Sequence, residues 1–201
     1  MRRTAGRLLA TAVALVALGC LTQKPPEKRR YVFDARREAP AATREGVGVL
    51  RIDRIRVSPL FERKGFVYRT GESSFESDFY NEFYAPPGVL LRQALLAWLG
   101  PSSTFASVSD STNPGDATWL LEGQVDNLYG DLRDPRDPRA VLEIEFALLY
   151  AKSLNVRFRK SYAASVQAED TSAPAIMAAW NEALAAILAE LEGDLRARRA
   201  R

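Results

Sequence analysis

Two glutamates, Glu143 and Glu145, come nearest in this sequence to a pair of residues that could do acid–base chemistry. Glycosidases work with two carboxyl groups, one as the acid and the other as the base or nucleophile. The pair lies within residues 142–150, where apolar and polar residues alternate, so both carboxylates share the polar face of a predicted strand. A solvated sheet face explains this pattern without any chemistry, and Asp126 and Asp131 form no better pair. We therefore predict no catalytic residue. A hydrolase remains an alternative, which loss of activity on mutating Glu143 or Glu145 would support.

The absence of histidine from the sequence removes most other catalytic arrangements. Ser–His–Asp and Cys–His sites need an imidazole as the base, and histidine is also the commonest metal ligand. No phosphate-binding loop is present either, because Gly46–Val47–Gly48 lacks the later glycine and the helix that should follow. We predict neither a metal nor a cofactor, and no ATPase activity in this chain.

The N-terminal residues have the features of an export signal that ends in a lipid-modified cysteine. Three arginines precede the apolar run Leu8–Leu18, which is too short to cross a bilayer, since a spanning helix needs roughly 20 residues. The sequence Ala17–Leu18–Gly19–Cys20 resembles a bacterial lipobox, and Cys20 is the only cysteine of the chain. We predict a lipoprotein signal peptide over residues 1–19 and acyl chains, such as palmitate, on Cys20. A plain secretory signal with an incidental cysteine is the alternative.

Lipidation would tether the protein permanently to a membrane. Two or more acyl chains anchor a protein stably, and bacterial lipoproteins carry three. An aspartate after the cysteine would resemble the inner-membrane retention signal of enteric bacteria, but Leu21 follows Cys20. We therefore expect the outer membrane, on its periplasmic side. Residues 20–30, rich in proline and charge, are the predicted tether. The Lys28–Arg30 cluster could touch anionic headgroups, although a solvated linker is the simpler interpretation.

The net charge gives no argument for nucleic-acid binding. The formal charge of +3 comes from 28 basic and 25 acidic residues, and the signal peptide takes three of the arginines with it. The mature chain is then formally neutral, and it shows no basic stripe with interleaved aromatic residues. We expect no nucleic-acid partner and a single domain over residues 31–201.

A β-hairpin that leads into a short apolar helix organises the centre of the chain. The predicted strands are 66–69 and 75–83, and the period of two places three rings on the core: Phe75, Phe79 and Phe83. Pro86 and Pro87 stop the second strand and begin a helix, because proline donates no ladder hydrogen bond but suits a first helical turn. Leucines and a tryptophan at helical spacing follow, until Gly100–Pro101 ends the helix.

Further elements complete an α+β pattern. A phase change within the predicted strand Val47–Val57 indicates a bulge near Asp53–Arg54. Ser172 is the expected N-cap of a long C-terminal helix. Other short strands are predicted at Tyr31–Phe33 and Thr104–Val108, and three longer ones, which short turns join into an antiparallel meander, at Trp119–Tyr129, Leu142–Tyr150 and Val156–Val166. In the first of these three, the residues expected on one face are Trp119, Leu121, Gly123, Val125, Asn127 and Tyr129. We therefore expect a mostly antiparallel sheet with two amphipathic helices packed on one face.

The central stretch resembles the ABC-type transport auxiliary lipoproteins, the PqiC-like family. The matching motifs are Val67–Tyr68–Arg69, Asp78–Phe79–Tyr80, Pro86–Pro87 and Leu95–Leu96–Ala97–Trp98–Leu99. One departure is Phe83–Tyr84–Ala85–Pro86, since the family usually has a tryptophan before its alanine–proline step. The order of elements is similar to that of the family over nearly all of residues 31–195.

The resemblance implies an accessory lipoprotein of an ABC/MCE-type transport system. Such a protein would dock to an MCE-domain protein and ABC transporter subunits, and help to move phospholipid or another hydrophobic substrate across the periplasm. A lipid ligand and a homo-oligomer are compatible with this function, but no residue requires either. The residues predicted to contact partners are Tyr68, Arg69, Tyr80 and Tyr84. Ordinary packing at a sheet edge is the alternative for these side chains. A structural or regulatory periplasmic lipoprotein in envelope or cell-wall assembly is the alternative for the whole protein.

Overall fold

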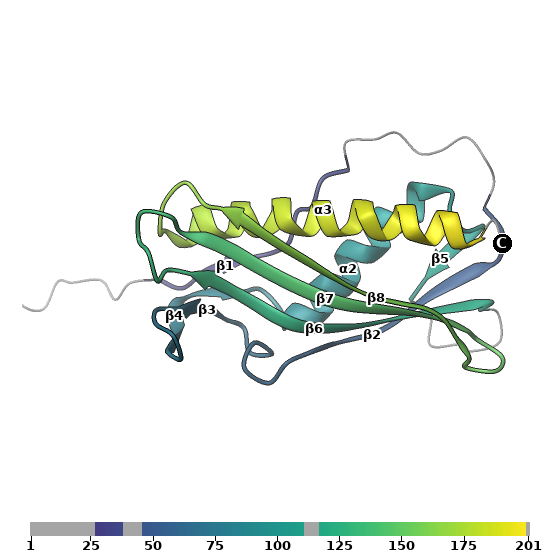
Figure 1. The fold of residues 1–201 in the computed structure, drawn as a ribbon, viewed down its shortest axis with the longest axis horizontal. Helices are drawn as coiled ribbons and strands as arrows, with labels where there is room; N and C mark the ends of the chain where they lie inside the picture. The colour runs from purple at the N-terminus through teal and green to yellow at the C-terminus, as the bar shows by residue number, and fades with distance from the viewer. Residues whose placement is uncertain (1–26, 38–45, 111–116, 200–201) are drawn as a thin grey trace, which may run out of the picture.

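The computed structural model of the chain describes residues 27–37, 46–110 and 117–199, which form an eight-stranded sheet with two helices (Figure 1). The predicted signal peptide and Cys20 lie outside the described residues. The strands are β1 (Arg29–Tyr31), β2 (Val49–Val57), β3 (Gly65–Arg69), β4 (Phe75–Phe83), β5 (Ser107–Ser109), β6 (Trp119–Asp131), β7 (Arg139–Tyr150) and β8 (Val156–Gln167). The helices are α2 (Pro87–Leu99), followed by a 3₁₀ turn (Gly100–Ser102), and α3 (Ala173–Arg199).

The sheet is mixed and is built around β6. The antiparallel meander β6–β7–β8 is confirmed, and β7 pairs with β6 along its whole length. The other edge of β6 therefore holds two strands in succession: β2 runs parallel to it at Trp119–Val125, and β3 at Gly130–Asp131. The hairpin β3–β4 is antiparallel, whereas β1 joins β4 and β5 joins β2 in parallel. The α+β class is thus confirmed, with more parallel pairing than the sequence suggested, because α2 and the hairpin act as crossovers.

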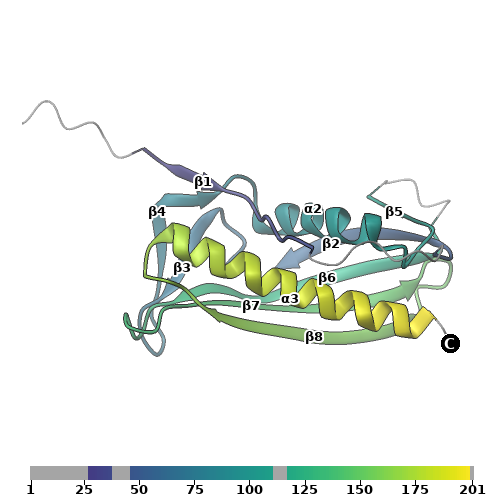
Figure 2. The ribbon, with the colours of Figure 1, turned by 90° about the horizontal axis from the view of Figure 1, so that it is seen from above.

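Both helices pack on one face of the sheet. α3 packs on β7 and β8, and Figure 2 shows it in front of the strands, while α2 packs on β2. The apolar residues of both helices belong to one core. In that core the ring of Trp180 from α3 lies 4.9 Å from that of Phe66 in β3 and 5.6 Å from that of Phe83 in β4, between centroids. The large apolar side chains of α3 recur at helical spacing, and all are buried: Met177, Trp180, Leu184, Ile187, Leu188, Leu191 and Leu195.

α3 begins at the predicted cap. The Oγ atom of Ser172 accepts a hydrogen bond from the backbone N–H of Ala175 at 3.4 Å. Within the described part of the chain, α3 is the one helix long and apolar enough to cross a membrane, with a mean hydropathy of 1.2 over its most apolar window, but 50% of that window is buried inside the domain. The apolar composition of α3 therefore reflects its packing on the sheet.

α2 has the predicted boundaries, and it lies unusually close to β2. Pro87 occupies the first turn, and the 3₁₀ turn that starts at Gly100 ends the α-helix. Gly88 faces the backbone of β2 so closely that a Cβ atom there would lie 2.4 Å from the carbonyl oxygen of Ile55. The absence of a side chain at this position is therefore what lets α2 pack on the bulged part of β2.

Two bulges overturn the expected side-chain alternation. The predicted bulge in β2 is confirmed by a register shift between Ile52 and Ile55. β4 has an unexpected bulge, however, and Phe79 is 69% exposed rather than in the core. In β6, the register with β7 shifts between Val125 and Asn127, so Leu128 and Gly130 take the buried positions expected of Asn127 and Tyr129.

Two short strands are displaced from their predicted positions. β1 comprises Arg29–Tyr31 and not Tyr31–Phe33, because the chain leaves β4 after Tyr31 and the backbone N–H of Asp34 donates to Asn181 of α3 at 2.9 Å. β5 begins at Ser107 and not at Thr104, because the 3₁₀ turn and the left-handed Ser103 (φ 54°) hold the preceding residues away from β2.

Candidate functional site

The carboxylate of Asp78 creates the bulge that turns Phe79 outward. Its Oδ1 atom accepts hydrogen bonds from the backbone N–H groups of Tyr80 at 2.7 Å and Asn81 at 2.9 Å, and its Oδ2 atom accepts one from the side-chain amide of Asn81 at 2.8 Å. Burial raises the pKa of Asp78, but these hydrogen bonds outweigh burial, so the net pKa is below the ordinary value. The aspartate is therefore held ionised, and it fixes the local turn of the strand.

Four exposed side chains form a surface that we call the aromatic patch: Val32, Phe79, Tyr80 and Tyr84. The rings of Phe79 and Tyr80 meet edge to face, with centroids 5.2 Å apart. The backbone N–H of Tyr84 donates to the carbonyl of Tyr31 at 2.8 Å, which places Tyr84 next to Val32 across the β1–β4 pair. The patch therefore covers the outer side of the sheet edge at which the described chain begins.

Charged side chains fasten β1 to β4 within this patch. Lys28 Nζ lies 3.2 Å and Arg30 Nε 3.0 Å from the two carboxylate oxygens of Glu82, and Lys28 Nζ also lies 4.6 Å from the ring centroid of Phe79. Hydrogen bonds from Arg30 and Lys28 lower the pKa of Glu82. Lys28, Arg29 and Tyr80, together with two neighbours, line a hollow of about 480 Å³ at the start of β1.

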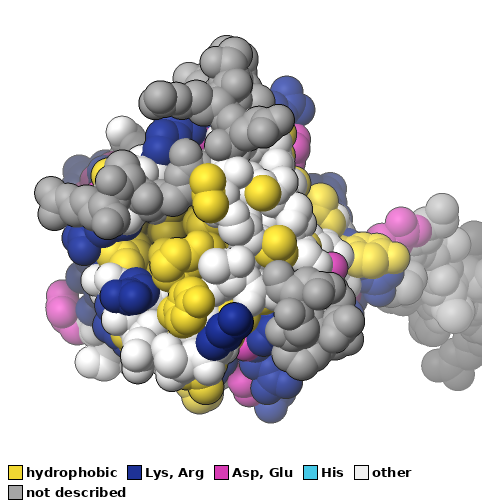
Figure 3. All heavy atoms as spheres, turned by 90° about the vertical axis from the view of Figure 1, so that its right-hand side faces the viewer, with side chains coloured by type: hydrophobic (Ala, Val, Ile, Leu, Met, Phe, Trp, Pro, Cys, Tyr) yellow, Lys and Arg dark blue, Asp and Glu magenta, His cyan; other side chains and the backbone are white. Residues whose placement is uncertain are grey.

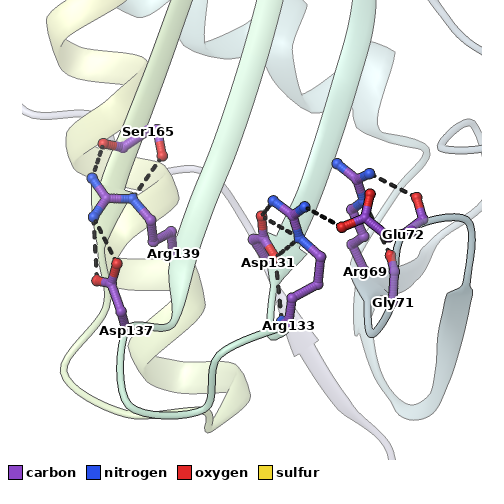
Figure 4. A network of polar contacts seen from close by, with 8 residues as sticks. All are labelled: Arg69, Gly71, Glu72, Asp131, Arg133, Asp137, Arg139 and Ser165. Atoms are coloured by element: carbon purple, nitrogen blue, oxygen red, sulfur yellow. Dashed lines mark hydrogen bonds and ion pairs between the residues drawn. The ribbon is translucent and has the colours of Figure 1, made fainter.

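The structure divides the four predicted partner contacts into two pairs. Tyr80 and Tyr84 are exposed, at 44% and 64%. Tyr68 is half-buried and donates to Asp78 Oδ2 at 3.3 Å, and burial, followed by the charge of Asp78, raises its pKa. The guanidinium of Arg69 donates to the carbonyls of Gly71 and Glu72 and closes the β3–β4 turn (Figure 4). Tyr68 and Arg69 thus hold the hairpin, while Tyr80 and Tyr84 remain available to a partner.

The end of the sheet around that turn carries exposed ion pairs. Arg133 pairs with Asp131 at 2.6 Å and approaches Glu72 at 3.8 Å, which links the β6–β7 turn to the β3–β4 turn (Figure 4). Arg139 pairs with Asp137 at 3.2 Å. The side chain of Asp131 is 14% exposed, whereas Arg133, Arg139 and Asp137 are 39–50% exposed. Ion pairs with such exposed members contribute little to stability, so we interpret them as contacts that hold the turns.

A second surface is an open groove of about 880 Å³ between β2 and the start of α2. Its basic side chains are Arg54, Arg56 and Arg92, against the acids Asp53 and Glu62. Half-exposed apolar residues complete its lining, among them Val57 and Val89. No sequence pattern predicts this groove, although the predicted bulge near Asp53–Arg54 forms one of its walls.

A further apolar surface lies at the end of the domain that carries the β7–β8 turn. Figure 3 views this end, and hydrophobic side chains gather at the centre of the face. The exposed apolar residues of the neighbouring strands and turn are Val47, Leu154 and Val156. Segment 38–45, which comes shortly before Val47 in the sequence, and segment 111–116 lie outside the described residues. We therefore assign no site to this apolar surface.

The paired glutamates lie on the polar face of β7, as predicted. Glu143 accepts a hydrogen bond from the side-chain amide of Asn127 at 2.8 Å, and Glu145 forms an ion pair with Arg159. Burial, together with the charges of these two glutamates, raises the pKa of Asp126. Among the described residues, no group of three His, Cys, Asp or Glu side chains is placed to hold a metal ion.

Comparison with known families agrees with the features above. The family model described as "ABC-type transport auxiliary lipoprotein component" matches residues 31–192. This chain belongs to that family. The matched residues include the aromatic patch and the groove between β2 and α2, but not the first residues of β1. They also include all four predicted partner contacts. No curated protein matches the chain.

Solved structures share the fold at low sequence identity. A crystal structure of a protein from Xanthomonas campestris has a TM-score of 0.68 at 16% identity, and the similarity covers 86% of this chain and 94% of that one. An uncharacterised protein has a TM-score of 0.68 at 15% identity, over 84% of this chain and 99% of the other. A PelC dodecamer from Paraburkholderia phytofirmans reaches only 0.42 at 13% identity, over 76% and 92%, which is too distant to bear on assembly.

Proposed function

We propose that this chain is an auxiliary lipoprotein of an ABC/MCE-type transport system that moves phospholipid or another hydrophobic substrate across the periplasm. In this proposal the lipid on Cys20 anchors the protein to the outer membrane, facing the periplasm. The domain acts by docking to partner subunits and not by catalysis. The family match over residues 31–192 is the observation that carries the proposal.

The groove between β2 and α2 is the surface we assign to the partner subunit. Arg54 and Arg56 are exposed on the bulged end of β2, and Val89, 48% exposed, lies opposite them on α2. Charged groups around a partly apolar groove favour a partner segment with complementary charge, here acidic, and apolar anchors. The mature chain is formally neutral, so this local excess of arginine is a specific feature of the groove.

Site-specific photo-crosslinking in cells tests this docking. A photo-crosslinking amino acid at position 56 should capture an MCE-domain protein or an ABC transporter subunit, because Arg56 lines the groove. The matched control is position 157, an exposed arginine at the start of β8, outside the groove. Transport subunits captured from position 56 but not from 157 support the proposal. Equal capture from both positions, or capture of peptidoglycan synthases instead, would contradict it.

A further inference from the structure

The aromatic patch lies at the point where the lipid anchor must join the domain. Cys20 is the only cysteine available for lipidation, and the described chain begins at Glu27. Fully extended, the residues between them span at most roughly 25 Å. β1 then pairs with Asn81–Phe83 in β4, directly beside the exposed rings. A domain held by so short a tether keeps this sheet edge close to the membrane surface.

The side chains of the patch are of the types that settle in the membrane interface. Aromatic residues concentrate at the headgroup level of bilayers, where their rings are partly apolar and partly polar. Phe79 and Tyr84 are the most exposed of the patch, at 69% and 64%. Phe79 reaches this position only because Asp78 bulges the strand, since strict alternation would have placed the ring in the core. The structure thus uses a specific hydrogen-bond network to present an apolar ring to solvent.

Exposed cations line the β1 side of the patch. Lys28, Arg29 and Arg30 equal the neighbouring acids Glu27, Asp78 and Glu82 in number, but the carboxylate of Asp78 is occupied by hydrogen bonds within the bulge. The side chain of Glu82 is 15% exposed, against 40% for Lys28 and 55% for Arg30, and Lys28 lies over the ring of Phe79. The hollow of about 480 Å³ between Tyr80 and the start of β1 is partly lined by these cations. Juxtamembrane cations attract anionic headgroups, and a tethered surface needs only weak affinity because its local concentration is high.

We propose that the aromatic patch rests on the membrane to which the lipid anchor is attached. Phe79, Tyr80 and Tyr84 lie among the headgroups, and the cations of β1 contact anionic phospholipid. This contact orients the domain relative to the bilayer, and it leaves the groove between β2 and α2 for the partner subunit. The inference rests on the lipid anchor at Cys20 that the proposed function includes. The contact needs no transport subunit, so failure of the docking experiment would leave it standing.

Fluorescence quenching by spin-labelled lipid tests the orientation directly. In the natively lipidated protein Cys20 is acylated, so Phe79→Cys provides a single free thiol for an environment-sensitive fluorophore. The labelled protein is reconstituted into vesicles of phosphatidylcholine and phosphatidylglycerol that contain lipid spin-labelled near the headgroup. The matched control is Val156→Cys, since Val156 is 49% exposed and begins β8 next to the β7–β8 turn, at the opposite end of the domain from β4 (Figure 1).

We expect quenching at position 79 to exceed quenching at position 156 by about threefold or more, because only an interfacial residue lies within reach of the spin label. Removing phosphatidylglycerol should reduce the quenching at position 79. Equal quenching at both positions would overturn the proposal. The proposal would also be wrong if the fluorophore at position 79 became shielded only after envelope proteins were added. That result would assign the patch to a protein partner. Circular dichroism of both labelled variants checks that each retains its fold.

Discussion

At the scale of single residues, Glu192 is a buried charged group that joins the two helices. The residue is 5% exposed, and its carboxylate accepts hydrogen bonds from Arg37 at 2.9 Å and from the indole N–H of Trp98 at 3.0 Å. Arg196, one turn further along α3, pairs with it as well. One carboxylate therefore ties α3 to the end of α2 and to the segment that follows β1.

Substitution of Glu192 should be strongly destabilising. Glu192→Ala removes the carboxylate from a buried ion pair with Arg37, and removing one member of a buried ion pair costs about 3 kcal/mol or more. Urea unfolding followed by circular dichroism measures this change in free energy. Glu182→Ala, at an exposed position of the same helix, is the control and should change stability by less than about 0.5 kcal/mol. Equal effects of the two substitutions would contradict the role given to the buried carboxylate.

Asp194 should make stability depend on pH in the acid range. Its carboxylate accepts hydrogen bonds from Lys160 and from the hydroxyl of Tyr162, at 2.7 and 2.9 Å, and the bond from Lys160 is the largest cause that lowers the pKa of Asp194. Since the pKa is lower in the folded state than in the unfolded state, Asp194 stabilises the fold above its unfolded pKa, and this contribution is lost as the pH falls through the folded pKa.

The variant Asp194→Asn should therefore lose part of its stability near neutral pH and show a flatter fall below about pH 5. Thermal unfolding measured from pH 7 to pH 3 tests this expectation. Glu169→Gln, an exposed position on the loop before α3, serves as the control. A profile for Asp194→Asn that parallels the wild type throughout would show that the bond to Lys160 does not contribute.

At the scale of elements, the sequence predicts a feature well where the signal is local. Pro87 begins α2 because its fixed φ suits a first helical turn, and Ser172 begins α3 because its hydroxyl caps the helix. The position of Phe79 could not be predicted in this way, because the bulge depends on which backbone groups the carboxylate of Asp78 meets after β3 and β4 have paired. Which residues of β6 face the core likewise depends on the bulge that forms where β6 pairs with β7.

The predicted partner contacts and the groove show the same limit of prediction from sequence. All four residues were expected to contact partners, whereas the inward bonds of Tyr68 and Arg69 follow from the geometry of the folded hairpin. The groove joins Arg56 of β2 to Val89 of α2, and no sequence pattern links residues so far apart. Parallel pairing of β2 with β6 escaped prediction for the same reason, since it is set by the long connection between them.

The close approach of α2 to β2 gives a test with a matched control. Gly88→Ala would place its Cβ atom 2.4 Å from a backbone oxygen that cannot rotate away, so α2 must shift, at a cost of about 1–3 kcal/mol. Gly100→Ala meets nothing within 4 Å and has a helical φ of −53°, so it should be neutral or slightly stabilising. Thermal unfolding compares the two variants. A neutral Gly88→Ala would show that α2 is not fixed against β2 as described.

At the scale of the whole molecule, the fold separates two surfaces around one core. The aromatic patch lies where the predicted tether enters the sheet, and the groove lies where α2 starts on the bulge of β2. Both helices cover one face of the sheet and hold these two surfaces in a fixed relation. In the proposed function this arrangement would let the protein act as an adaptor between a membrane and a partner subunit.

The measurement that tests the central claim most directly is a pull-down of the natively lipidated protein from detergent-solubilised envelopes, with mass spectrometry of the co-eluting proteins and lipids. The account predicts an MCE-domain protein and ABC transporter subunits, and their loss when the groove carries Arg54→Glu and Arg56→Glu. The variant Arg157→Glu is the matched control and should retain them. Recovery of peptidoglycan synthases without any transport subunit would contradict the account, and would favour a protein of cell-wall assembly.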